Sequence, residues 1–237
     1  MRHPALLAPV LLVAACGGNA SAGPQTTRSF AVGGFTAVEL AGSDDVRVVR
    51  GSQASVTATG PADVLDRLDI HVEGDRLKIS RKRKAWNMGW GGGSHRGAMV
   101  TVTTPGITAA TLAGSGNLSV DRVSGDSFKG SLAGSGNLVL ANVRVTQVAL
   151  DLAGSGNLGA SGVVRDARLN VGGSGGISAL DLVSQTADVS LGGSGDVQVT
   201  ARDHAKISIA GSGNVTVKGT TNCQIAKVGS GDARCAP

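Results

Sequence analysis

The chain has 237 residues but no tyrosine, and its only aromatic side chains are three phenylalanines and two tryptophans. Globular cores usually depend on aromatic side chains to bury large areas, so a core of that kind is excluded. The apolar residues are mainly Val, Leu, Ile and Ala, and a hydrophobic content of 41% excludes a disordered chain. The 37 glycines neither recur at every third position nor leave room for heptads, which excludes collagen and coiled coils. The composition is typical of a β-structured repeat protein.

Long apolar runs are also missing, since no segment is apolar for 18 residues, and no transmembrane helix is predicted. The apolar run of residues 5–15 follows Arg2 and predicts a secretory signal peptide over residues 1–15. Its end, Val-Ala-Ala-Cys16, resembles a bacterial lipobox, which implies that Cys16 is lipidated and anchors the protein in the membrane. An ordinary signal peptide followed by an incidental cysteine is the alternative. Residues 16–28 are then a lipidated N-terminus and flexible tether, and Gly17 favours the outer membrane by resemblance to lipoproteins.

Cysteine and charge are both sparse. The two cysteines that remain after Cys16 are Cys223 and Cys235, and an even pair in an exported protein predicts a disulfide bond. The formal net charge of +5 is modest and favours an anionic surface, such as lipid headgroups or acidic glycans, as a contact. No nucleic-acid recognition motif is present, so nucleic acid is not an expected partner.

A repeat dominates the second half of the chain. Gly-Ser-Gly recurs seven times, at intervals of 18 to 20 residues, with first glycines at Gly114, Gly134, Gly154, Gly173, Gly193, Gly211 and Gly229. Apolar and polar residues alternate between the triplets, as in Leu118-Ser119-Val120, which indicates two short strands per period with one face buried. Such coils bury their apolar faces only against one another. The sequence therefore predicts an all-β fold, a parallel β-helix or flattened β-solenoid, over residues 107–237.

The triplets are expected at stacked corners of the coils, where glycine permits positive φ. The serine hydroxyls could bond to local backbone or to the next serine, and the Asn or Asp that follows could form an amide ladder. This predicted corner ladder comprises Ser115, Asn117, Ser135, Asn137, Ser155, Asn157, Ser174, Ser194, Asp196, Ser212, Asn214, Ser230 and Asp232.

Residues 29–106 are less regular and are expected to cap the solenoid within one continuous domain, 29–237. Residues 35–46 form a degenerate coil, Pro61 begins a short helix over 61–68, and residues 70–79 form a hairpin with a Gly74-Asp75 turn. Residues 81–96 combine four consecutive cations with both tryptophans. They are interpreted either as a contact loop for anionic lipid or glycan, or as a solvated hairpin tip covering the solenoid end. The candidate contact residues are Arg81, Lys82, Arg83, Lys84, Trp86 and Trp90.

No motif for catalysis, metal or cofactor binding emerges. The corners lack the calcium-binding nonapeptide spacing, no Gly-Lys-Ser/Thr follows a triplet, and no nucleophile elbow is present. The histidines lack spacing for zinc or a catalytic triad. The adjacent Asp44 and Asp45 could serve a polysaccharide-cleaving enzyme, but as consecutive residues they more simply flank a corner.

The lipobox, the Phe35-Thr-Ala-Val-Glu-Leu opening, the Gly74-Asp75 hairpin, the Thr103-Thr-Pro transition and the Leu-Ala-Gly-Ser-Gly-Asn-Leu coils together resemble the bacterial family called putative auto-transporter adhesin, head GIN domain. The resemblance spans about residues 30–232. It implies a right-handed parallel β-helix and supplies no catalytic residues, while the repeats and the irregular opening predict about seven to nine coils.

Three functions follow from these patterns. The first is a non-enzymatic cell-envelope lipoprotein, an adhesin that presents its β-helical surface to glycan, envelope polymer or protein. The second is a periplasmic structural or scaffolding protein. The third is a polysaccharide-active β-helix enzyme.

Overall fold

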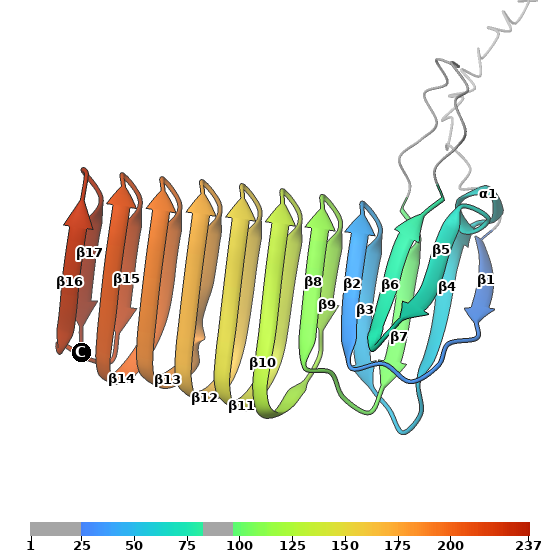
Figure 1. Cartoon of the computed structure of the whole chain (residues 1–237), viewed down its shortest axis with the longest axis horizontal. Coiled ribbons are helices and arrows are strands. Elements are labelled where there is room, and N and C mark those ends of the chain that lie inside the picture. The colour runs from blue at the N-terminus through green and yellow to red at the C-terminus, as the bar shows by residue number, and fades with distance from the viewer. Residues whose placement is uncertain (1–24, 83–96) are drawn as a thin grey trace, which may run out of the picture.

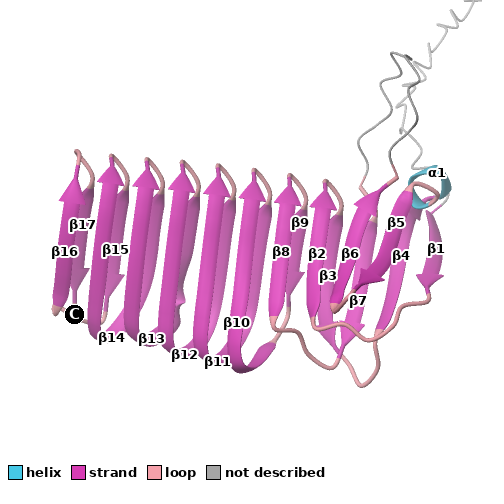
Figure 2. Ribbon diagram, viewed as in Figure 1, coloured by secondary structure: helices cyan, strands magenta, loops and turns pink. Residues whose placement is uncertain are grey.

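The computed structural model describes residues 25–82 and 97–237, and these residues form one long row of strands with a single short helix (Figures 1 and 2). The N-terminal elements are β1 (Gln25–Phe30), β2 (Ala37–Gly42), β3 (Asp45–Arg50), β4 (Ser55–Pro61), α1 (Ala62–Leu65), β5 (Leu68–Glu73), β6 (Arg76–Arg81) and β7 (Met99–Thr104). The repeat elements are β8 (Ala109–Gly114), β9 (Asn117–Val120), β10 (Val123–Gly134), β11 (Asn137–Gly154), β12 (Asn157–Gly173), β13 (Gly176–Gly193), β14 (Asp196–Gly211), β15 (Asn214–Lys218), β16 (Cys223–Val228) and β17 (Asp232–Ala236).

Successive coils stack as parallel strands whose paired residues are about 20 positions apart. Gly134 pairs with Gly114 on one side and with Gly154 on the other, so equivalent positions of the repeat lie directly above one another. Six such turns join the seven triplets. The all-β solenoid and its period of about 20 residues are therefore confirmed, while the right-handed path and the total of seven to nine coils stay predictions.

The core is a set of aliphatic columns enclosed by the coils. Leu112, Leu132 and Leu152 occupy one such column, because they pair in register and all three are buried. Phe35 and Phe128 are the buried aromatic residues of the described chain. The interior is thin enough for Val, Leu, Ile and Ala to fill it, which explains how the fold dispenses with large aromatic side chains.

The prediction of two short strands per coil is wrong for most of the repeat region. Each of β11, β12, β13 and β14 runs from one Gly-Ser-Gly corner to the next as a single strand of 16 to 18 residues. The register between neighbours shifts midway, for example between Leu140 and Val143. A β-bulge bends a strand and disrupts its ladder only locally, so the second bend of each coil needs no separate turn.

The N-terminal part caps the stack and follows an order that differs from the order of the sequence. β2 and β3 lie between β8 and β9 on one side and β6 and β7 on the other (Figure 1). The predicted hairpin is present as antiparallel β5 and β6, and the predicted short helix is present as α1, which follows Pro61. β1 and β4 pair antiparallel and close this end of the solenoid.

Candidate functional site

The Gly-Ser-Gly corners are held by backbone hydrogen bonds between coils. The N–H groups of Ser135 and Gly136 both donate to the carbonyl oxygen of Gly114, each at 3.1 Å, and the same arrangement recurs at other corners. Gly134 adopts φ 132°, and a Cβ atom built there would overlap that same carbonyl oxygen of Gly114. Glycine is therefore required at the corner both for its conformation and for the close approach of the next coil.

The triplet serines form an exposed row along this corner edge. Within residues 25–82 and 97–237, no side-chain hydrogen bond involves their hydroxyl groups, so the expected bonding of serine to local backbone or to the next serine is not made there. The physical reason is that backbone hydrogen bonds between coils already hold each corner together, so the serine hydroxyl groups are not needed for this. The row, which is open to solvent, comprises Ser115, Ser135, Ser155, Ser174, Ser194, Ser212 and Ser230.

The Asn and Asp side chains after the triplets form an interrupted ladder. Asn137 Nδ2 donates to Asn117 Oδ1 at 2.8 Å, and Asn117 Nδ2 donates to Asp45 Oδ1 at 2.6 Å. Asn157 continues the ladder towards Asn137 at 3.4 Å, and Asn214 donates to Asp196 at 3.0 Å in a separate pair. Asp232 bonds to Arg234, whose hydrogen bond lowers the pKa of this carboxyl below its ordinary value.

The ladder breaks at Gly176, which pairs with Asn157 and with Asp196 of the two neighbouring coils. Together with Gly159 it leaves a hollow of about 440 Å³ in this face. A Cβ at Gly159 would meet nothing within 4 Å, and one at Gly176 would make only ordinary contacts, the closest at 3.5 Å. The backbone therefore does not require glycine at either position, in contrast to the corners.

Arg81, predicted as a contact residue, has a structural partner instead. Its Nε and Nη2 atoms donate to the two carboxylate oxygens of Asp44 at 2.9 and 2.6 Å, and the Asp44 side chain is only 1% exposed. The hydrogen bond to Asp44 raises the pKa of the Arg81 guanidinium. Asp44 also accepts from the backbone N–H of Ala98 at 2.8 Å, so it ties together the two ends of the segment between β6 and β7.

The other contact-loop residues divide into two groups. Lys82 is exposed, and its backbone N–H donates to the carbonyl oxygen of Arg67. Arg83, Lys84, Trp86 and Trp90 lie outside the described residues. Asp45 bonds to Asn117 while Asp44 is occupied by Arg81, so the two carboxylates do not converge on a common point as a catalytic pair would.

A second hollow, of about 990 Å³, lies where the strands bend opposite the triplet corners, and sequence reasoning missed it. Arg144, Arg165 and Arg202 line it around the exposed Val163 and the partly buried Val183. Their scattered sequence positions give no periodic signal, because bulges shift the register at this bend.

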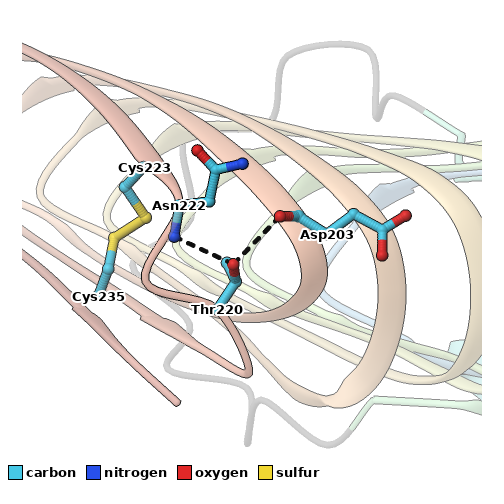
Figure 3. The surroundings of a disulfide bond; sticks show 5 residues. All are labelled: Asp203, Thr220, Asn222, Cys223 and Cys235. Atoms are coloured by element: carbon cyan, nitrogen blue, oxygen red, sulfur yellow. Dashed lines mark hydrogen bonds between the residues drawn. A yellow bond between two sulfur atoms is a disulfide. The ribbon is translucent and has the colours of Figure 1, made fainter.

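The last coil is closed by the disulfide between Cys223 in β16 and Cys235 in β17, whose Cα atoms are 6.6 Å apart. Thr220 reinforces the preceding turn: its hydroxyl donates to the carbonyl oxygen of Asp203, and it accepts from the backbone N–H of Asn222, each at 3.1 Å (Figure 3). The disulfide confirms the pairing of Cys223 with Cys235 that the sequence predicted.

Within the part of the chain that the structure describes, there is neither a cluster of metal ligands nor a helix that could span a membrane. No group of three or more His, Cys, Asp or Glu side chains is gathered there in a way that could hold a metal ion. None of the helices within 25–82 and 97–237 is long and apolar enough to span a membrane.

The family model described as "Putative auto-transporter adhesin, head GIN domain" matches residues 34–221. The chain belongs to this family. The head GIN domain family is an adhesin family rather than an enzyme family, and together with the disulfide it indicates an extracytoplasmic protein. The comparison with curated proteins finds no match.

Several solved structures share the fold of this chain. An adhesin from Bacteroides fragilis is 18% identical with a TM-score of 0.80, covering 91% of this chain and 98% of its own. A protein described as lipid-binding from Parabacteroides distasonis is 24% identical with a TM-score of 0.66, covering 91% and 97%. An adhesin from Parabacteroides merdae is 18% identical with a TM-score of 0.65, again covering 91% and 97%. At these identities the likeness concerns the fold.

Proposed function

We propose that this protein is a non-enzymatic lipoprotein of the cell envelope, an adhesin that binds a glycan or another envelope polymer along the side of its solenoid. One observation carries the proposal: equivalent outward positions of successive coils are stacked in register from Gly114 to Gly229. Such a surface offers similar side chains at a spacing of about 4.8 Å.

A repeating surface suits a repeating ligand. A polymer that lies along the solenoid axis can make many weak contacts at once, and the combined affinity exceeds that of any single contact. The exposed serine row and the Asn/Asp ladder supply hydroxyl and amide groups, which exchange hydrogen bonds with sugar hydroxyls. These features support binding rather than turnover, because Asp44 and Asp45 are held by different partners and no group of three or more His, Cys, Asp or Glu side chains within the described residues could hold a metal ion.

The proposed anchor is a lipid on Cys16, followed by the tether up to residue 28. Lipidation of this kind holds a protein at a membrane without a spanning helix. We infer that the domain is displayed from the outer membrane, on the cell surface or on its periplasmic side, with a right-handed coil path as in the β-helices that the family resembles.

Three experiments test this proposal. Binding of the purified protein to a panel of acidic and neutral polysaccharides and to isolated envelope polymers should reveal at least one polymer ligand, and a panel without any would contradict it. Protease added to intact cells should cleave a surface adhesin, whereas protection until the outer membrane is opened would favour the periplasmic scaffold. A C16S variant should leave the membrane fraction if Cys16 is the anchor.

A further inference from the structure

The hollow at the bend opposite the triplet corners combines an apolar floor with a cationic rim. Val163 lies in the floor and is 63% exposed, whereas most of the large aliphatic side chains in the fold are buried. Val183 pairs with Val163 in the next coil and extends the floor along the solenoid axis.

Three guanidinium groups surround these valines. Arg144 pairs with Val163 in the preceding coil, Arg165 lies two residues beyond Val163 on the same outward side, and Arg202 belongs to a later coil. Since adjacent coils are about 4.8 Å apart, Arg165 in β12 and Arg202 in β14 are separated by roughly 10 Å along the axis.

The arginines retain free hydrogen-bond donors. Arg144 and Arg202 make no ion pair or side-chain hydrogen bond with any residue that the structure describes. Arg165 uses its Nε atom to bind Asp166 at 3.0 Å, and both side chains are more than a third exposed, so this pair is weak. Asp203 is the one carboxylate that lines the hollow, which leaves an excess of positive charge.

Asp166 stays ionised and keeps its own partners. The Thr186 hydroxyl and the Arg165 guanidinium lower the pKa of this carboxyl below its ordinary value. Asp166 therefore orients Arg165, while the remaining guanidinium donors of Arg165 are available to a ligand.

We propose that this hollow binds a carboxylate-bearing polysaccharide, with sugar rings over the valines and carboxylates on the arginines. A sugar ring presents an apolar C–H face, which suits an exposed valine floor, and a carboxylate suits the forked donors of arginine. This proposal rests on the proposed function and goes beyond it, because it adds a binding site at the bend opposite the triplet corners and names the class of its ligand.

The test measures binding of an oligogalacturonate and of its methyl-esterified form, which has the same sugars without the charge. We expect the ester to bind at least about tenfold more weakly, since each charge-assisted hydrogen bond contributes roughly that factor. Binding of the free acid should also weaken as salt is raised.

Two variant pairs locate the site. R144Q/R202Q should weaken binding of the acid by tenfold or more, whereas R47Q/K218Q removes the same charge from exposed positions that do not line this hollow and should leave binding unchanged. V163D places a carboxylate in the floor and should abolish binding, while V163N should weaken it only modestly. Circular dichroism and thermal melting check that each variant is folded.

Three results would overturn the proposal. If R144Q/R202Q binds the acid as tightly as the wild type does, the acidic glycan binds elsewhere on the protein, and the proposed function still stands. Stronger binding to phosphatidylglycerol vesicles than to oligogalacturonate, lost in the same variants, would assign the hollow to a lipid surface. A wild-type protein that binds no polymer of the panel, acidic or neutral, would instead refute the proposed function itself.

Discussion

The Asp44 carboxylate receives two parallel hydrogen bonds from the Arg81 guanidinium, although the two residues are 37 positions apart in the sequence. Asp44 lies at the corner between β2 and β3, and Arg81 ends β6, the strand beside β2. The pair joins two adjacent coils and, through Ala98, fixes the points where the chain leaves β6 and enters β7.

Replacing Asp44 should destabilise the cap strongly. D44A leaves a partly buried guanidinium and the Ala98 N–H without their acceptor, which we expect to cost about 3 kcal/mol of unfolding free energy. Urea unfolding measures this loss. D45N is the matched control and should stay within about 0.5 kcal/mol, because Asp45 is only partly buried and the Asn117 side chain can still donate to the new amide. Equal effects of the two changes would argue against a special role for Asp44.

Replacing the triplet glycine should destabilise the fold, whereas replacing its serine should not. G154A forces a Cβ onto the carbonyl oxygen of Gly134 at a φ of 126°, and we expect a loss of about 2 kcal/mol or more. S155A removes an exposed hydroxyl and should change stability by less than about 0.5 kcal/mol. The melting temperatures of the two variants test this difference. A destabilised S155A would show that the row of serine hydroxyl groups stabilises the fold.

Restoring the broken ladder should stabilise the solenoid. G176N supplies an amide that can donate to Asn157 Oδ1 and removes a flexible glycine from a strand, for a gain of about 1 kcal/mol. The control G175N, one residue earlier, places a Cβ against the carbonyl oxygen of Gly156 and should destabilise. A lower melting temperature for G176N would contradict the expected stabilisation.

Removing the disulfide should loosen the last coil first. The bond joins residues separated by 12 positions, and closing a loop of that size contributes about 3 kcal/mol in the loop-entropy model. In a C223S/C235S variant, hydrogen exchange should accelerate in β16 and β17 before it changes in β11 or β12, because each coil makes most of its contacts with its immediate neighbours. Uniform acceleration along the solenoid would contradict this local effect.

Much of the fold could be predicted because it is encoded locally. The period-two alternation identifies which residues face inward, and the spacing of the triplets gives the length of a coil. The disulfide was predictable from the number and position of the cysteines. The bend opposite the corners was not, because β-bulges have no fixed sequence signature and the chain continues through them as one strand.

The candidate sites were less predictable than the fold. Arg81 belongs to a run of cations in the sequence, and only the stacking of β6 on β2 brings it to Asp44. Arg144, Arg165 and Arg202 occupy different positions of their repeats and meet at one hollow because of the register shifts.

The sequence by itself determined the repeat, the corners and the thin aliphatic interior, since each depends on residues close together in the chain. The tertiary structure decided which coils are neighbours, and it placed β2 and β3 between coils that follow them in the sequence. Contacts between coils depend on that order and on the register of each bend. The buried ion pair and the arginine-lined hollow both arise from such contacts, so they follow from the assembled solenoid rather than from any local pattern.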